Sequence, residues 1–426
     1  MVKAVLIGAG QRGAQVYAEY ALKYPNDLKI VAVAEPDEER RTVTAAKHHI
    51  DSSLVFTDWK DLFQLGKIAD CAMVCTQDRF HVEPVKEALK LGYHVMCEKP
   101  MSPNAAECIE MGQFAEKYHK TLTICHVLRY SPFYTKLKEV VDSKVIGDIV
   151  SIQHIESVGY WHQAHSFVRG NWRNSKESSP MILQKSCHDM DILTWLIGKR
   201  CTAVSSFGSL KHFKESEAPE GAGHNCMLDC AIEDTCPYSA KKIYCEDEEW
   251  YSDTIRKVVA LEGTQEAVKD ALQKGPYGRC VYRCDNDVVD HQVVNLQYED
   301  GVTVSFTMCA FTYEGSRIMN IMGTKGQIVC DMEKNEIEVR DFLTGNKTYH
   351  TVKTGVGGHS GSDEKFMKGF LKTVETDGKF TLSSAAVSVD SHLMALAAEE
   401  SRLTGQTVYM EEFRRRQADK TVMTDK

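Results

Sequence analysis

The stretch VKAVLIGAGQRG occupies residues 2–13 and decides the fold of the first domain. Its apolar run, Val2–Gly8, is expected of a strand buried on both faces of a parallel sheet. A helix is expected over Gln11–Tyr24, and the turn before it carries the glycines of a G-x-G-x-x-G pattern, which are Gly8, Gly10 and Gly13. A strand, a tight glycine turn and a helix together predict the opening unit of a nucleotide-binding α/β domain.

Strand and helix patterns continue to alternate up to residue 125. Further strands are expected at Leu28–Ala34, Ala69–Thr76, His94–Cys97 and Thr121–Cys125, with helices at Glu38–His48, Pro84–Leu91 and Ala105–His119. Repeated strand–helix units with right-handed crossovers predict a doubly wound parallel sheet, that is, a Rossmann domain over residues 1–125.

The glycine turn is a candidate site for the pyrophosphate of a dinucleotide. Glycines let the backbone approach the phosphates, and the helix N-terminus at Gln11 and Arg12 presents N–H groups and the positive end of a dipole. Glu35 ends the second strand, where a carboxylate accepts hydrogen bonds from ribose hydroxyls and repels a 2′-phosphate. We therefore expect NAD in preference to NADP. The alternative is a glycine turn that binds no ligand.

Residues 126–426 have a different character. Helices are expected at Tyr134–Asp142, Ile182–Leu196, Asp363–Thr376 and Ser384–Leu403, and strands at Ile149–Tyr160, Thr202–Phe207, Val288–Tyr298, Thr303–Phe311, Arg317–Gly323 and Gln327–Asp331. This pattern predicts an α+β domain with a large, mainly antiparallel sheet that carries the substrate groove. A polar, cysteine-containing stretch at about 214–285 interrupts the strands and is interpreted as an insertion.

Composition and charge exclude several classes of protein. The chain has 51 Lys and Arg against 60 Asp and Glu, a net charge of −9 that argues against a general nucleic-acid binder. We expect no membrane segment, because no apolar run approaches the roughly 18 residues that a spanning helix needs. The 15 cysteines are an odd number and many lie in apolar runs, which favours reduced thiols in a cytoplasmic protein.

The stretch from Val74 to Pro100 reads VCTQDRFHVEPVKEALKLGYHVMCEKP. A strand ending at Thr76, a histidine at position 81 and a strand followed by Glu98-Lys99-Pro100 resemble the Gfo/Idh/MocA oxidoreductase family, which includes glucose–fructose oxidoreductase and inositol dehydrogenase. The resemblance continues, less strictly, through RYSP at 129–132, IGDI at 146–149 and HDMD at 188–191. It implies an NAD-dependent enzyme of sugars or cyclitols, and a homodimer or homotetramer formed by the open face of the second sheet. It also implies cofactor contacts at Thr76, His81, Glu98 and Lys99.

Lys99 is the first catalytic candidate. Removing a hydride from a carbinol requires a group that takes the hydroxyl proton. A lysine at the C-terminal end of a parallel strand can do so if burial and a cationic neighbour lower its pKa. The family often has a cis peptide bond before the proline at position 100. The alternative is an ordinary surface lysine after a strand.

A second group of candidates lies on the helix expected over Ile182–Leu196. Gln184, His188 and Asp191 are spaced four and three residues apart, so they are expected on one face of that helix. His188 fits a proton relay or a contact to a substrate hydroxyl, with Asp191 orienting it. Many relatives have Asp where this chain has Gln184, so Lys185 is the expected substitute in the relay. The alternatives are a satisfied interface histidine and a structural lysine.

Other candidate substrate contacts are weaker. In the family, substrate contacts lie just after the last Rossmann strand, where this chain has His126 and Arg129. Aromatic side chains at the mouth of a cleft can stack on a sugar ring, and the candidates here are Tyr160, Trp161 and Trp172. His359 lies in a glycine-rich loop of a kind that relatives carry near the substrate. Ordinary loop packing is the alternative for each of these residues.

Four cysteines of the insertion fall within twenty residues: Cys226, Cys230, Cys236 and Cys245. Four thiols close in sequence can hold zinc or an iron–sulfur cluster, although their spacing fits neither usual pattern. Disulfides and free cysteines are the alternatives. A small polar insertion is expected to lack a core of its own, which favours some cross-link.

Three functions are compatible with these residues. The first is an NAD-dependent oxidoreductase that takes a hydride from a hydroxyl carbon of a sugar, cyclitol or sugar derivative. The second is a hydrolase or lyase that oxidises its sugar only transiently and recycles the NAD. The third is an NAD-binding sensor without catalysis, against which the presence of Lys99 and His188 argues.

Overall fold

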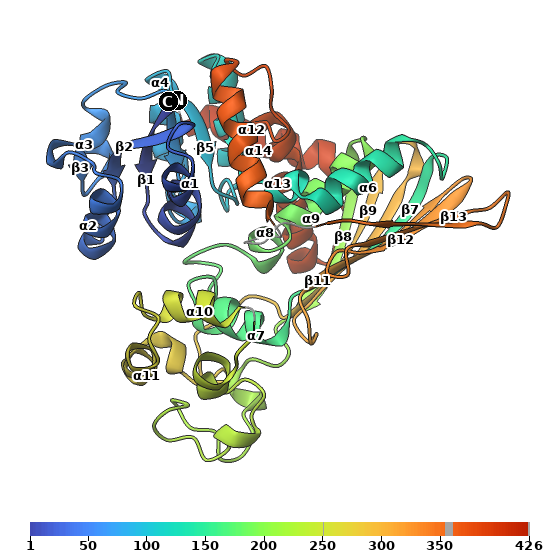
Figure 1. The fold of residues 1–426 in the computed structure, drawn as a ribbon. Helices are drawn as coiled ribbons and strands as arrows, with labels where there is room; N and C mark the ends of the chain where they lie inside the picture. Colours follow the sequence, from blue (N-terminus) through green and yellow to red (C-terminus); the bar gives the residue numbers. More distant parts are fainter. Residues whose placement is uncertain (250, 354–360, 425–426) are drawn as a thin grey trace.

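The computed structural model describes residues 1–249, 251–353 and 361–424 of the 426-residue chain. Two sheets organise these residues, and the insertion lies beside them as a separate group of short helices (Figure 1). All fifteen cysteines are free thiols. None of the helices in these described residues combines the length and the apolar character that crossing a bilayer requires.

The first sheet is the predicted Rossmann sheet. Its six strands are all parallel, in the order β3-β2-β1-β4-β5-β6, which is the doubly wound order with its switch point between β1 and β4. The strands are β1 Val2–Ile7, β2 Leu28–Ala34, β3 Val55–Phe56, β4 Cys71–Val74, β5 His94–Cys97 and β6 Leu122–Ile124. The helices between them are η1 Gln11–Ala18, α1 Glu19–Lys23, α2 Glu38–Lys47, α3 Trp59–Phe63, α4 Val82–Lys90 and α5 Ala105–Lys117.

The register of this sheet aligns four strand ends. Ile7 pairs with Val74, Val74 with Cys97, and Cys97 with Ile124. Because the strands are parallel, the segments that come directly after them meet at the same edge. These segments contain the glycine turn, Thr76, Lys99 and His126.

The second sheet has nine strands in the order β14-β13-β12-β11-β7-β10-β9-β8-β15. Only the β7–β10 pairing is parallel, so the prediction of a mainly antiparallel sheet is confirmed. The strands are β7 Ile149–Ser157, β8 Cys201–Ser209, β9 His291–Tyr298, β10 Thr303–Cys309, β11 Ser316–Gly323, β12 Gly326–Asp331, β13 Glu336–Asp341, β14 Lys347–Thr351 and β15 Val408–Tyr409. The sequence patterns did not predict β13, β14 or β15.

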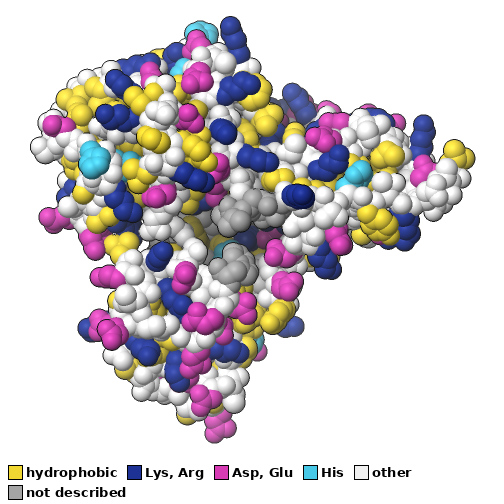
Figure 2. Space-filling view, in the orientation of Figure 1, with side chains coloured by type: hydrophobic (Ala, Val, Ile, Leu, Met, Phe, Trp, Pro, Cys, Tyr) yellow, Lys and Arg dark blue, Asp and Glu magenta, His cyan; other side chains and the backbone are white. Residues whose placement is uncertain are grey.

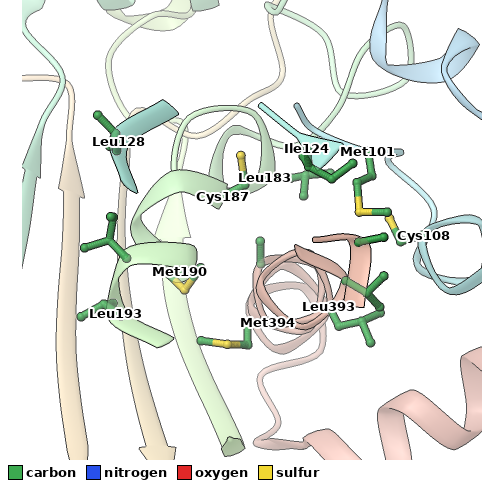
Figure 3. Close-up of a cluster of buried hydrophobic side chains, with 14 of the residues drawn as sticks. Met101, Cys108, Ile124, Leu128, Leu183, Cys187, Met190, Leu193, Leu393 and Met394 are labelled. Carbon is green, nitrogen blue, oxygen red and sulfur yellow. The ribbon is translucent and has the colours of Figure 1, made fainter. Parts of the chain in front are cut away.

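Helices cover one face of the second sheet, and α9 and α13 pack against each other on it. Met190 of α9 and Met394 of α13 lie near each other in the buried cluster of Figure 3, and Leu393 lies on the other side of α13, toward Met101 and Cys108. The helices of this part of the chain are α6 Pro132–Asp142, α8 Met181–Gln184, α9 Cys187–Ile197, α12 Ser362–Glu375, α13 Ala385–Thr404 and α14 Met410–Thr424. The last of them, α14, was not predicted.

The opposite face of the second sheet carries exposed apolar side chains. Phe207 pairs with Val293, and Ile155 pairs with Ile318. Thr307 lies between these two pairs, opposite both Val293 and Ile155. A single row of side chains therefore crosses five strands, and its four apolar members are each at least 37% exposed.

Helix α12 follows the second sheet in the sequence, but it packs against the first, Rossmann sheet. Its Phe366 and Phe370 are buried in the core cluster of the Rossmann sheet, together with Tyr17 of η1. The ring of Phe366 contacts those of Tyr17 and Tyr130. A segment more than 360 residues from the N-terminus thus completes the nucleotide-binding domain.

Two predicted elements end where the backbone changes direction. Strand β7 ends at Ser157, because Gly159 turns the chain at a φ of +88° and Tyr160 begins the short helix α7 Tyr160–His162. The helix expected over Ile182–Leu196 is divided into α8 and α9, since Ser186 has non-helical angles of −100° and 8°. Gln184 and His188 therefore lie on different helices, contrary to the expectation of one helix, whereas His188 and Asp191 are both on α9.

The insertion has a core of its own, contrary to the expectation from its polar sequence. Its helices η8 Lys242–Glu246, α10 Ser252–Val259 and α11 Gln265–Lys274 enclose buried aromatic and aliphatic side chains, among them Tyr244, Ile255, Val268 and Leu272. This core also takes in Ala164 and Val168 of η5 Gln163–Arg169. Tyrosines supply much of the apolar surface, which is why hydropathy missed the core.

Candidate active site

The glycine turn has the shape that a pyrophosphate needs. A Cβ on Gly8 would lie 2.6 Å from the carbonyl oxygen of Cys75, and one on Gly13 would lie 2.1 Å from the carbonyl oxygen of Gly8. A Cβ on Gly10 would meet nothing within 4 Å. The first and third glycines are therefore required by packing, and the second leaves open space in front of η1, which begins at Gln11.

Glu35 lies where the sequence predicts it, beside the glycine turn. Its buried carboxylate accepts hydrogen bonds from the backbone N–H groups of Ala9 at 2.6 Å and Asp37 at 3.0 Å. An acid held against the turn fits recognition of a ribose.

Arg12 ties the glycine turn to Glu98 and to the C-terminal helix α12. Its guanidinium forms ion pairs with Glu98 at 2.7 Å and with Asp363 at 2.8 Å. The hydroxyl of Tyr17 also donates to Glu98, at 2.6 Å. Burial raises the pKa of Glu98, but the charges of Arg12 and Lys99 and the hydrogen bonds from Arg12 and Tyr17 together hold that pKa below its usual value. Glu98 is thus a fixed, ionised group at the strand edge.

His81 holds two segments of this edge together. Its Nδ1 lies 2.9 Å from the carbonyl oxygen of Pro100, and its Nε2 lies 3.0 Å from that of Thr76. The Lys99–Pro100 peptide bond is cis. The hydroxyl of Thr76 is buried without a hydrogen-bond partner among the described residues, so it is available to a ligand. The predicted contact His81 therefore positions Thr76.

Lys99 connects the Rossmann sheet to the second domain. Its ammonium group donates to the carbonyl oxygen of Gln184 at 3.0 Å, and its backbone N–H donates to Glu98 at 2.8 Å. The lysine is only partly buried. Its position at the end of β5 places it at the same edge as the glycine turn.

Lys185 lies in the break between α8 and α9 and faces β7. Its ammonium nitrogen is 3.2 Å from Glu156 and 3.4 Å from Nδ1 of His162. Burial lowers the pKa of Lys185, although the charge of Glu156 opposes this. Burial also lowers the pKa of His162 well below its usual value, and the charges of Lys185 and Lys99 lower it further. The two lysines therefore share a neighbourhood around His162.

A buried network behind Lys185 was not found from the sequence. Arg317 of β11 contacts Glu156 at 2.9 Å and Asp189 at 2.8 Å, and Asp189 also bonds to His154 at 2.7 Å. Burial raises the pKa of Glu156, against the opposing charges of Arg317 and Lys185. His154 and Glu156 occupy buried alternate positions of β7, where apolar side chains are usual. That break in the alternation is the feature that could have identified them.

Three other predicted site residues meet around α9. Arg129 forms a two-pronged pair with Asp191 at 2.7 and 2.8 Å. The ring of His126 is fully buried, 5.7 Å from that of His188, and burial lowers the pKa of His126 well below its usual value. Neither ring nitrogen of His126 has a hydrogen-bond partner among the described residues. A neutral, buried imidazole thus lies beside His188, and Asp191 is engaged by Arg129.

The side chains of Gln184 and Trp172 bind each other. With its amide nitrogen directed at Asp78, Gln184 donates to that carboxylate at 2.8 Å and accepts from the indole N–H of Trp172 at 2.6 Å. Both side chains are thereby held by protein groups. In this arrangement Gln184 presents its backbone carbonyl, not its side chain, to Lys99.

The predicted aromatic residues that follow β7, Tyr160 and Trp161, pack against the core of the insertion. Trp161 stacks on Tyr251, with ring centroids 3.6 Å apart and planes 10° apart. The ring of Tyr160 lies 6.3 Å from that of Tyr313. Between the Rossmann domain and the insertion the surface is hollowed (Figure 2). The candidate His359 lies outside the described residues.

Three of the four predicted cysteines come together. Cys226, Cys230 and Cys236 line one small cavity, whereas its fourth cysteine is Cys280 and not the expected Cys245. Within the described ranges, no group of three or more His, Cys, Asp or Glu side chains is arranged to hold a metal ion.

The comparisons with known proteins identify the class. Residues 2–126 match the model described as "Oxidoreductase family, NAD-binding Rossmann fold". Residues 138–410 match "Oxidoreductase family, C-terminal alpha/beta domain". The chain therefore belongs to the Gfo/Idh/MocA oxidoreductase family, as its motifs predicted.

Several curated proteins share part of this sequence. The oxidoreductase YteT of Bacillus subtilis is 27% identical over 69% of this chain and 70% of its own length. D-Glucoside 3-dehydrogenase of Escherichia coli is 33% identical over 35% of this chain and 41% of its own length. An inositol 2-dehydrogenase of Corynebacterium glutamicum is 24% identical over 47% of this chain and 55% of its own length. Apart from YteT, the chain spans about half or less of these relatives.

Solved structures share the complete fold. Levoglucosan dehydrogenase, determined with NADH and levoglucosan, has a TM-score of 0.70 at 18% identity, covering 96% of this chain and 99% of that one. An oxidoreductase of Agrobacterium radiobacter, in complex with NAD⁺, L-tartaric acid and magnesium, has a TM-score of 0.69 at 15% identity, covering 96% and 99%. At this identity the likeness establishes the fold alone.

Because Gly10 and Gly13 have different surroundings, alanine at Gly10 should weaken NAD⁺ binding, whereas alanine at Gly13 should destabilise the fold. Gly10→Ala adds a methyl group only to open space, so the free energy of unfolding changes by less than about 1 kcal/mol while NAD⁺ affinity falls at least about tenfold. Gly13→Ala collides with the Gly8 carbonyl and lowers the free energy of unfolding by about 3 kcal/mol. Denaturant unfolding and calorimetric titration with NAD⁺ measure both quantities. Unchanged NAD⁺ affinity in Gly10→Ala would contradict the assigned cofactor position.

Proposed function

We propose that this chain is an NAD-dependent dehydrogenase that takes a hydride from a hydroxyl-bearing carbon of a sugar, cyclitol or sugar derivative. The observation that carries the proposal is the position of Lys99. It lies two residues beyond the end of β5, at the edge where the glycine turn lies, and it shares its neighbourhood with Lys185 and His162. The names of the relatives, inositol 2-dehydrogenase and D-glucoside 3-dehydrogenase, support a polyhydroxylated substrate.

The residues at the strand edge fit a nicotinamide dinucleotide. The open space at Gly10 would take the pyrophosphate, and the carboxylate of Glu35 would face the adenosine ribose. Glu35 carries a negative charge that would repel a 2′-phosphate, which favours NAD over NADP. The unpartnered hydroxyl of Thr76 and the ionised Glu98 would line the nicotinamide end. When bound, NAD⁺ supplies the hydride acceptor.

The protein's part in the reaction is to hold the substrate hydroxyl and take its proton. Burial favours the neutral amine of Lys185, whose nitrogen has a lone pair for that proton. The ammonium group of Lys99 would donate a hydrogen bond that orients the hydroxyl oxygen, and His188 would contact a neighbouring hydroxyl. Glu156 and Arg317 hold Lys185 in place from behind.

The reaction is tested by incubating the protein with NAD⁺ and a panel of sugars, cyclitols and nitrophenyl glycosides. We expect NADH to accumulate in step with substrate loss. Lys99→Ala should lower kcat by about 10²–10⁴-fold, because it removes the donor that orients the reacting hydroxyl. The control Lys90→Ala changes an exposed lysine paired with Glu87 and should leave kcat unaltered.

Two results would contradict this function. Nitrophenol released only with NAD⁺ present, but without net NADH, would mean that the cofactor is recycled and the net reaction is cleavage. Full dehydrogenase activity in Lys99→Ala would remove Lys99 from the site.

The role of Lys185 leads to a defined pH dependence. Because the neutral amine is the active form, the rate should rise with pH as Lys185 loses its proton. Glu156 raises the pKa of Lys185, so Glu156→Gln should lower this pKa and move the rising limb of kcat/KM to lower pH. Lys185→Arg keeps the charge but cannot release a proton, so it should abolish the limb together with most of the activity. A limb that stays in place in Glu156→Gln would rule out Lys185 as the titrating group.

We also propose a homo-oligomer that buries the open face of the second sheet. The row through Phe207, Val293, Ile155 and Ile318 is an exposed apolar strip of the kind that marks an interface. Ile155→Lys should convert the oligomer to monomers in light-scattering measurements at micromolar concentration. Val43→Lys, at an exposed position of α2, is the control. A monomeric wild-type protein would overturn this assignment.

A further inference from the structure

Four cysteines from two separate stretches of the sequence line one small cavity in the insertion. Cys226, Cys230 and Cys236 lie within eleven residues of one another, and Cys280 comes more than forty residues later. A short antiparallel bridge brings the two parts together: Cys226 N–H donates to the Gly278 carbonyl, and Cys280 N–H donates to the His224 carbonyl, each at 2.8 Å. Because side chains alternate along such a bridge, Cys226 and Cys280 project to the same side.

The same cavity is lined by Arg169, one of the largest fully buried side chains of the protein. Its Nε donates to the carbonyl oxygen of Arg279 and its Nη2 to that of Tyr238, each at 2.7 Å. Nη2 also lies 3.6 Å from Sγ of Cys226. Nη1 is buried without a hydrogen-bond partner, and no carboxylate pairs with this guanidinium anywhere in the described residues.

A buried guanidinium without a counter-charge is energetically costly. The charged group loses its hydration, and a carbonyl dipole replaces only part of it. Neutral thiols do not supply the missing negative charge, whereas metal-bound thiolates do, and their sulfurs accept hydrogen bonds from N–H donors. Arg169 and the four cysteines therefore complement each other only when the thiols are ionised by a metal.

The arrangement of the sulfurs decides which kind of metal centre fits. A single zinc ion draws four sulfurs to about 2.3 Å from one point, and the described residues contain no group arranged in that way. In a cubane cluster each thiolate binds a different iron, so the sulfurs stand further apart around a larger space. We propose that Cys226, Cys230, Cys236 and Cys280 bind an iron–sulfur cluster, with Arg169 balancing its negative charge.

Assembly of this centre requires no oxidant from the protein. Each of the four thiols releases a proton to solvent as its sulfur binds iron. The core either arrives already assembled from a cluster donor or forms from two ferrous ions, two ferric ions and four inorganic sulfides, so that it reaches its 2+ state with no further electron transfer. Arg169 ends η5, which begins directly after His162, the neighbour of Lys185. The centre therefore anchors the insertion to the segment that borders the proposed active site.

The test is iron and acid-labile sulfide analysis of the full-length protein, purified without oxygen and, in parallel, reconstituted without oxygen from equal amounts of ferrous and ferric iron together with sulfide. We expect about four iron and four sulfide per chain, with visible charge-transfer absorption. Cys280→Ser and Cys226→Ser should each lose most of the iron and the absorption. Cys245→Ser is the matched control, since Cys245 belongs to the insertion but does not line the cavity, and it should keep both.

Misfolding is separated from loss of the centre by NAD⁺ binding, which the Rossmann domain provides and which each variant should retain. Arg169→Met is a further variant that leaves all four thiols in place, and its cluster should be lost faster on exposure to air. The proposal is overturned if the wild-type protein holds neither iron nor sulfide after reconstitution. It is also overturned by one zinc ion per chain with no sulfide, or by iron that Cys280→Ser retains.

Discussion

The buried carboxylate of Glu98 is the point on which the rest of the site depends. It accepts hydrogen bonds from Arg12, from Tyr17 and from the backbone N–H of Lys99. The carboxylate of Glu98 thus connects η1 to the segment that follows β5 and contains Lys99. Arg12 carries the connection on to Asp363 at the start of α12.

This arrangement explains why a C-terminal helix belongs to the N-terminal domain. Helix α12 buries Phe366 and Phe370 against η1 while Asp363 binds Arg12. Opposite charges at one end and aromatic packing along the helix fix its position in two ways. Loss of Glu98 would leave Arg12 with Asp363 alone and would loosen the glycine turn, the strand edge and α12 together, since breaking a buried ion pair leaves an uncompensated charge.

The parallel, doubly wound character of the first sheet and the edge where its strands end could be predicted because they rest on local patterns. Each apolar strand and the glycine turn can be recognised from a pattern of about ten residues, and a parallel sheet then aligns the ends of its strands. Lys99 and Glu35 were found for the same reason. The helix around Lys185 could not be predicted correctly, because its break depends on the angles of Ser186, and the apolar positions on either side keep helical spacing.

Contacts between distant segments were the other limit of the sequence. The sequence around Lys185 does not indicate that Glu156 of β7 contacts it, or that Arg317 of β11 contacts Glu156. The cysteine cavity shows the same limit. Cys280 lines it where Cys245 was expected, because a bridge between residues 225 and 279 brings Cys280 close to Cys226. Spacing along the chain identifies ligands only when one element carries them all.

Two charged side chains thus bond across the boundary between the two domains. Lys99 reaches from β5 to the backbone of α8, and Arg129 reaches from η4 Val127–Tyr130 to Asp191 of α9. Both contacts cross from the Rossmann domain to the helices of the second sheet. A cation that bonds across such a boundary resists sliding of one domain on the other, because any shift would leave a buried charge without its partner. Arg169 differs from Arg129, because no carboxylate of the described residues pairs with it. It bonds to two carbonyls and a thiol of the insertion, and a cluster on the neighbouring cysteines would supply the counter-charge that these groups do not.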